Sequence, residues 1–175
     1  MLDIAVAYNR YKFIGYEFLT WLWYVINKTP DILTSLDPEF VSLETGNRIV
    51  LENIRKEALE SVTIKGNDAD LQEGKLSLGK GGLVTELNLI LTCGSNRWQF
   101  TVKGESLNLS NFKVPYTGPI ESEEQIEGAV LEKVYLYSKA IEFINNLFKL
   151  FIKTRLSEQW SDNLVPRIGT WIDRG

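Results

Sequence analysis

The chain has 175 residues, 19 basic and 23 acidic side chains, and a net charge of −4 at pH 7. The 44% of hydrophobic residues and the absence of low-complexity tracts indicate a globular domain rather than long disorder, and the acidic balance does not favour uniform duplex-DNA binding. Histidine is absent and Cys93 is the only cysteine, which excludes a histidine-assisted nucleophile, a zinc site built on thiolates and an internal disulfide. We expect no cofactor, no metal and no recognisable catalytic motif.

The first predicted element is an apolar helix from about Tyr11 to Ile26. Its apolar residues surround the helix axis, which predicts burial on most sides. The apolar run Phe13–Ile26 has 14 residues, short of the roughly 20 that span a bilayer, so we expect no membrane insertion. Trp21 and Trp23 allow two interpretations, core packing or a protein interface, and we name both as candidate interface residues.

An antiparallel sheet of about five strands is expected next, because the connections are too short to cross over. Weak alternation on both sides of Thr45-Gly46-Asn47 predicts a hairpin that turns at Gly46. Further strands are expected at residues 61–65, 83–92, 97–103 and 107–109. The clearest is 83–92, where leucines alternate with mostly polar residues.

A short helix is predicted between Asp68 and Leu78, with Gly79 in the left-handed conformation that often ends a helix. Asp68, Asp70 and Glu73 at its start can be interpreted in two ways. Paired carboxylates can hold Mg²⁺ for phosphodiester cleavage, but acids also stabilise any helix N-terminus, and we favour the second interpretation. The glycines and lysines of 79–82 do not form a phosphate loop, since a helix precedes them and a strand follows.

A long helix is predicted from Glu123 to Arg155, started by a capping box of Ser122 and Gln125. Two adjacent apolar stripes give it a wide face, able to cover a sheet together with another helix or a second copy of the chain. The first stripe is Val130, Val134, Tyr137, Ile141, Ile144, Phe148 and Phe151, and the second is Leu136, Ala140, Phe143, Leu147 and Leu150. Tyr137 and Phe148 join the candidate interface residues. Trp160 and Trp171 are expected to fasten the tail to the body.

Charge is unevenly distributed along the chain. Residues 31–74 hold ten acids and four bases (−6), whereas residues 75–113 hold five bases and two acids (+3). The five bases are Lys75, Lys80, Arg97, Lys103 and Lys113. They are either part of a solvated mixed surface or a site for a polyanion.

The stretch 79–89, followed by Trp98–Val102 and by a leucine-containing segment that ends in Lys113-Val114-Pro115, resembles the C-terminal part of the recombination-associated protein RdgC family. Glu17–Trp23 and Glu44–Arg48 resemble divergent members, described as RdgC-like or as putative exonucleases. The resemblance is firmest over residues 61–115.

This resemblance implies a cytoplasmic, nucleoid-associated bacterial protein linked to DNA recombination. RdgC proteins are described as ring-shaped dimers that bind duplex DNA without sequence preference. On that basis Lys75, Lys80, Arg97, Lys103 and Lys113 are the expected DNA contacts, acting as point charges to phosphate. The exonuclease label is not carried over, because the sequence holds no nuclease motif.

The sequence therefore predicts a single α+β domain over 1–175. Residues 1–30 provide a buried apolar helix, 40–115 the antiparallel sheet with a short helix, and 121–171 the C-terminal helices, the long one packed on one face of the sheet. The predicted function is a non-catalytic, RdgC-like duplex-DNA-associated homodimer. The alternative is a protein–protein interaction module that uses an aromatic helix surface without nucleic acid, and the third hypothesis is a metal-dependent nuclease.

Overall fold

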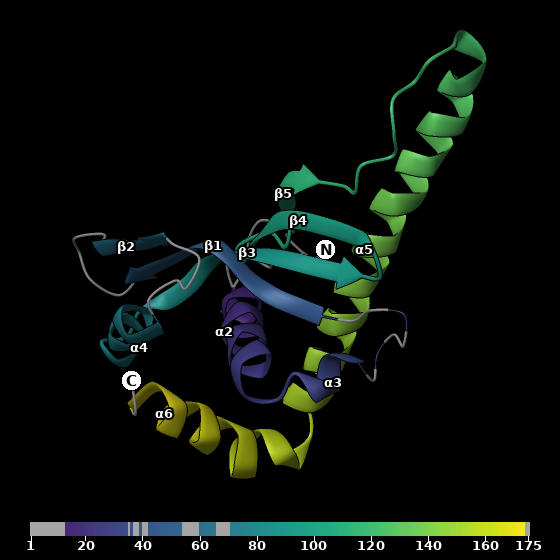
Figure 1. The fold of residues 1–175 in the computed structure, drawn as a ribbon. Helices are drawn as coiled ribbons and strands as arrows, with labels where there is room; N and C mark the ends of the chain where they lie inside the picture. The colour runs from purple at the N-terminus through teal and green to yellow at the C-terminus, as the bar shows by residue number, and fades with distance from the viewer. Residues whose placement is uncertain are drawn as a thin grey trace, which may run out of the picture.

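The strands of the protein form one antiparallel sheet in the order β2-β1-β3-β4-β5 (Figure 1). The computed structural model describes residues 13–34, 36, 39, 42–53, 60–65 and 71–173. The strands are β1 (Ser42–Asn53), β2 (Glu60–Lys65), β3 (Leu83–Cys93), β4 (Asn96–Lys103) and β5 (Leu109–Lys113). The predicted α+β class, with one antiparallel sheet and a long C-terminal helix, is confirmed.

The helices that contact the sheet pack on one of its faces. They are α2 (Phe13–Lys28), α3 (Asp31–Thr34), α4 (Leu71–Gly79) and α5 (Ile126–Arg155). A π-helical turn, η2 (Trp160–Leu164), leads into α6 (Val165–Asp173), which passes beneath α2 and α4 (Figure 1). Within the described residues no helix is long and apolar enough to cross a membrane.

The core lies between the helices and one face of the sheet. Nine of the 16 residues of α2 are buried, which confirms the prediction from its apolar circumference. Leu87, Leu89 and Leu91 of β3 are fully buried beneath the helices, as their alternation predicts. The backbones of α2 and the turn after β4 touch closely, because a Cβ on Gly15 would lie 1.8 Å from the carbonyl oxygen of Gly104.

The predicted hairpin at Gly46 is wrong, because β1 runs through this position as one strand. It pairs with β3 on both sides of the glycine, at Thr45↔Leu89 and at Ile49↔Leu87, so three residues of β1 face one residue of β3. This is a β-bulge rather than a turn. A Cβ on Gly46 would lie 1.9 Å from the Oδ1 atom of Asn88, so the glycine is required by a close approach across the sheet.

Three local predictions at element ends are also corrected. Gly79 is the last residue of α4, and the left-handed residue is Gly81, with φ 89°. Ser122 makes no side-chain capping bond to the 3₁₀ turn Glu123–Gln125 that precedes α5. Leu107 occupies a left-handed turn position with φ 56°, so β5 begins two residues later than the predicted strand.

Both stripes of α5 contribute to the core, the first only through its C-terminal residues, of which Ile144 and Phe151 are buried. The second stripe packs in the core through Leu136, Ala140, Phe143 and Leu147. The N-terminal half of the helix projects away from the sheet, with the loop after β5 running beside it (Figure 1). The predicted docking of the tail is confirmed, since Trp160 lies 5.6 Å from Phe151 between ring centres. Trp171 lies 5.3 Å from Trp23 by the same measure.

Candidate nucleic-acid interface on the second face of the sheet

The face of the sheet opposite the helices, which we call the second face, carries the alternate residues of each strand. Strand register fixes its membership, because residues directly opposite each other share a face. Val50 pairs with Thr63 of β2 and with Glu86 of β3, and Asn88 pairs with Thr101 of β4. Its central residues Val50, Asn88 and Thr101 are buried, and the basic side chains around them reach solvent.

Three of the five predicted DNA contacts lie on the second face. Arg97 pairs with Thr92 and Lys103 pairs with Glu86, at opposite ends of β4. Five residues lie between them, and the six steps along the strand span about 20 Å. Lys113 pairs with Gln99 between them, and all three basic side chains are exposed.

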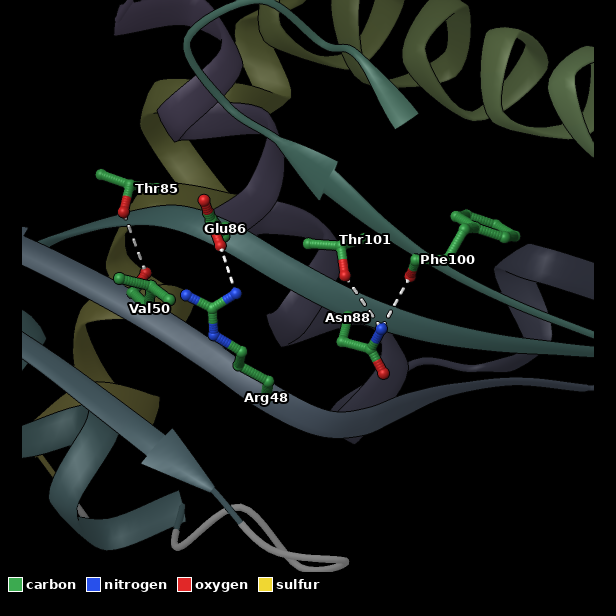
Figure 2. Close-up of polar contacts among 7 residues, drawn as sticks. All are labelled: Arg48, Val50, Thr85, Glu86, Asn88, Phe100 and Thr101. Carbon is green, nitrogen blue, oxygen red and sulfur yellow. Dashed lines mark hydrogen bonds and ion pairs between the residues drawn. The ribbon is translucent and has the colours of Figure 1, made fainter. Parts of the chain in front are cut away.

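Two further cations on the second face were not among the predicted contacts. Arg48 and Lys65 pair with each other across β1 and β2. The Arg48 Nη1 atom lies 2.9 Å from the Glu86 Oε2 atom (Figure 2). Glu86 in turn pairs with Lys103 of β4. Lys65, Arg48, Glu86 and Lys103 thus form a row across four strands, about 15 Å wide at the usual strand spacing.

The centre of the second face is a buried polar network around Asn88. Its Nδ2 atom donates to the Phe100 carbonyl at 3.1 Å and to the Thr101 hydroxyl at 3.0 Å, as Figure 2 shows. Its Oδ1 atom accepts from Gln99 Nε2 at 3.0 Å. Since the amide is 4% exposed and bonded through both of its polar atoms, the network fixes the register of β3 against β4.

The second face carries a net positive charge although the chain is acidic. The bases assigned to it by register are Arg48, Lys65, Arg97, Lys103 and Lys113, and the acids are Glu44, Glu52 and Glu86. Five bases minus three acids leave +2. Within the described part of the chain, Arg48 is the one base of this set that has an ion-pair partner.

No family model matches the chain, and no curated protein matches it. The expected relation to RdgC therefore stays a prediction, and DNA contact has to be inferred from the charges of the second face.

Lys75 and Lys80 do not join the other three predicted contacts. Lys75 lies on α4, on the helical side of the sheet, and its Nζ atom is 5.3 Å from the ring centre of Trp171. Lys80 directly follows α4 and is exposed. One flat surface therefore cannot use all five cations.

The predicted interface residues separate into two groups. Trp21 and Trp23 are 2% and 0% exposed, so their proposed place at a surface is wrong: the apolar circumference of α2 buries them beneath the sheet. Tyr137 is exposed, and its ring lies 4.7 Å from that of Phe112. Phe148 is half-buried and packs edge-on against Phe18 at 5.2 Å.

The third hypothesis, a metal-dependent nuclease, receives no support from the described residues. No three acidic or cysteine side chains among them gather closely enough to hold a metal ion. Glu73 is exposed on α4, whereas Asp68 and Asp70 lie outside the described residues. Cys93 is a half-buried free thiol at the end of β3.

Proposed function

We propose that the protein is a non-catalytic, RdgC-like DNA-associated protein that binds duplex DNA through backbone phosphates and acts in DNA recombination. The observation that supports this proposal is the set of cations on the second face, four of which have no carboxylate partner among the described residues. Phosphate contacts of this kind position a protein on DNA without reading its sequence.

The layout of the second face suits a phosphate backbone better than a base edge. The row from Lys65 to Lys103 is about 15 Å wide, slightly more than the roughly 12 Å of a major groove, so its ends can reach phosphates on both sides of that groove. Flexible lysines then serve as point charges, which gives binding that depends on salt and not on sequence.

We further propose that the protein acts as a homodimer through the projecting half of α5. Val130, Val134, Tyr137 and Ile141 of its first stripe are 38–56% exposed, although all are apolar or aromatic. An isolated helix as short as this projecting half is marginally stable in water. Soluble monomers also rarely expose large apolar patches. A partner surface is therefore needed to cover the stripe.

A second copy of the chain can cover this stripe with its own. Ile126, Val130, Val134, Tyr137 and Ile141 recur at steps of three and four residues, so they lie on one side of the helix, and all are exposed. An isologous helix pair would bury the two stripes against each other.

Shape and charge favour an antiparallel arrangement of the two helices. A groove of about 410 Å³ lies at the base of the projecting half, between Phe112 of β5 and Ile141 of α5, and can receive apolar side chains from the N-terminal half of a partner helix. The tip is acidic through Glu121, Glu123, Glu124 and Glu127, whereas Lys149 and Lys153 lie near the other end of the helix. An isologous, two-fold pairing places each acidic tip beside the basic end of its partner.

Titration of a short labelled duplex of arbitrary sequence tests the DNA proposal. The triple variant Arg97→Gln/Lys103→Gln/Lys113→Gln is expected to lose most binding at low salt. The slope of log K against log salt should fall by about 0.9 for each phosphate contact removed. The matched control is Lys28→Gln/Lys80→Gln/Arg167→Gln, which removes the same charge from the helical side of the sheet, away from the second face and from α5, and should bind much more like the parent. Absence of binding by the parent at low salt, or equal losses in both variants, overturns the proposal.

Light scattering tests the homodimer independently of DNA. The parent is expected to have the mass of two copies at high salt, because the contact is apolar, and Val134→Glu should be monomeric. Glu132→Gln, on the same helix but outside the first stripe, is the control and should remain dimeric. A monomeric parent excludes the dimer. A dimer without any DNA binding favours the alternative function, an interaction module.

A further inference from the structure

A cavity with a charged lining lies in the helical layer, away from the second face. It has a volume of about 580 Å³ and opens between the end of α2, α4, η2 and α6. This volume is within the range of about 300–1,000 Å³ that small-molecule sites occupy. The cavity is therefore large enough for a ligand of about the size of a nucleotide.

The charges around this cavity are mainly positive. Lys28 of α2, Lys75 of α4 and Arg167 of α6 line it, together with one acid, Asp162 of η2. Three bases minus one acid leave +2, in a chain whose net charge is −4. None of these four side chains forms an ion pair within the described part of the chain. Three elements thus bring unpaired cations together around one concave surface, where an anion would relieve their mutual repulsion.

Lys75 is held in place by aromatic packing. Its Nζ atom lies 5.3 Å from the centre of the Trp171 ring, a cation–π geometry. Trp171 is 5% exposed and is fixed in turn by edge-on contacts with Trp23 at 5.3 Å and Tyr24 at 5.6 Å. The position of this cation is therefore determined by the core, unlike that of a free surface lysine.

Polar groups beside the cations add hydrogen-bonding capacity. Asp162 and Asn163 lie in the π-helical turn η2. π-Helical turns are rare in proteins, and those that occur are frequently found at functional sites. The Thr170 hydroxyl donates to the Pro166 carbonyl at 3.0 Å, which leaves its oxygen free to accept. A ligand in the cavity thus meets cations together with an acceptor carboxylate and an amide.

We propose that this cavity binds a phosphate monoester that also carries hydroxyl groups, the chemistry shared by nucleotides and sugar phosphates. Lys28, Lys75 and Arg167 hold the phosphate by charge-assisted hydrogen bonds. Asp162 accepts from the ligand hydroxyls, and this gives the acid a role that simple anion binding would not. The site is separate from the second face, so it does not depend on DNA binding.

Calorimetry on the full chain tests the proposal with four probes: inorganic phosphate, ribose 5-phosphate, adenosine 5′-monophosphate and adenosine. The first three are expected to bind and adenosine is not, because it lacks the anion. A tighter fit for adenosine 5′-monophosphate than for ribose 5-phosphate assigns the site to nucleotides, and the reverse assigns it to sugar phosphates. Absence of heat from the three phosphates overturns the proposal.

Variants separate this site from general electrostatics. Arg167→Gln should lower the affinity for each of the three phosphate-containing probes by about tenfold, the effect of losing one charge-assisted hydrogen bond. Lys149→Gln, an exposed cation on α5, is the matched control and should change nothing. Asp162→Asn should strengthen inorganic phosphate but weaken ribose 5-phosphate, because it removes a repulsive charge and a hydroxyl acceptor together. The assignment is overturned if Arg167→Gln and Lys149→Gln change the phosphate affinities equally. It is also overturned if Asp162→Asn changes the affinities for inorganic phosphate and ribose 5-phosphate in the same direction. The second-face variant Arg97→Gln/Lys103→Gln/Lys113→Gln should leave phosphate affinity intact, so failure of either proposal can be recognised separately.

Discussion

The indole Nε1 atom of Trp98 donates a 3.0 Å hydrogen bond to the main-chain carbonyl of Leu136. The bond joins β4 to α5 at the first buried residue of the helix. N-terminal to Leu136, α5 projects from the sheet, so this contact anchors the base of the projecting half (Figure 1).

Trp98→Phe is expected to lower the free energy of unfolding by about 2–4 kcal/mol, because it removes this hydrogen bond and leaves a cavity in the core. Urea denaturation measures the loss. Trp160→Phe is the control: its ring packs on Phe151, but the residue is only half-buried and its indole N–H donates no hydrogen bond to another described residue. It should lose less than half as much. Equal losses would contradict the anchoring role of the Trp98 bond.

Gly46→Ala should be strongly destabilising, by about 2–4 kcal/mol, because the new Cβ would overlap the Asn88 Oδ1 atom. Asn88→Ala provides the matched test, since it removes the obstructing amide together with its hydrogen bonds. The double variant should be more stable than the sum of the two single losses predicts, with a coupling of about 1 kcal/mol or more. Additive losses would mean that the glycine is required for a reason other than this contact.

The same contact explains where sequence patterns predict the fold and where they do not. The alternation of 83–92 and the stripes of 123–155 are local periodicities, and both elements form as predicted because one face of each is buried. The local sequence around Gly46 likewise predicts a turn. Its actual role depends on Asn88, which lies 42 positions along the chain, and no local pattern contains that contact.

Sequence patterns predict only part of the candidate site, for the same reason. Arg97 and Lys103 are an even number of positions apart in one predicted strand, so the sequence alone predicts that they lie on the same face. Arg48 and Lys65 join them only through the register of β1 with its two neighbours, which is set by a bulge and by long-range pairing. Lys75 leaves the group because α4 packs on the helical side of the sheet. Basic residues that are close in sequence were thus an incomplete guide to the charges that the fold brings together.

An ion pair between Glu39 and Lys139 predicts a specific pH dependence. The hydrogen bond from Lys139 lowers the pKa of Glu39 below its ordinary value, and the same bond raises the pKa of Lys139. The Glu39 contribution to stability is present above the unfolded-state pKa of about 4.3 and is lost as the pH falls through the lower folded-state pKa. The Lys139 contribution is present below about pH 10.4 and is lost as the pH rises through the raised pKa.

Glu39→Gln should therefore lose less thermal stability than the parent as the pH falls from 5 through and below the ordinary glutamate pKa of about 4.3. Scanning calorimetry at several pH values measures the difference in melting temperature. Glu142→Gln removes an exposed acid that has no ion-pair partner among the described residues and should follow the parent curve. The effect should be small and should fade in high salt, because Glu39 is largely exposed. Parallel curves for Glu39→Gln and the parent would exclude a contribution from this pair.

The salt dependence of DNA binding tests the second face and the dimer contact on α5 together. A dimer presents two second faces to a single duplex, so it should neutralise about twice as many phosphates as one copy and gain avidity from the second contact. Val134→Glu, which leaves every cation in place, should therefore bind DNA more weakly and with a salt slope about half that of the parent. Glu132→Gln should keep the parent slope. A monomeric Val134→Glu protein with an unchanged slope would mean that one copy makes all the phosphate contacts, and DNA binding would then be independent of α5.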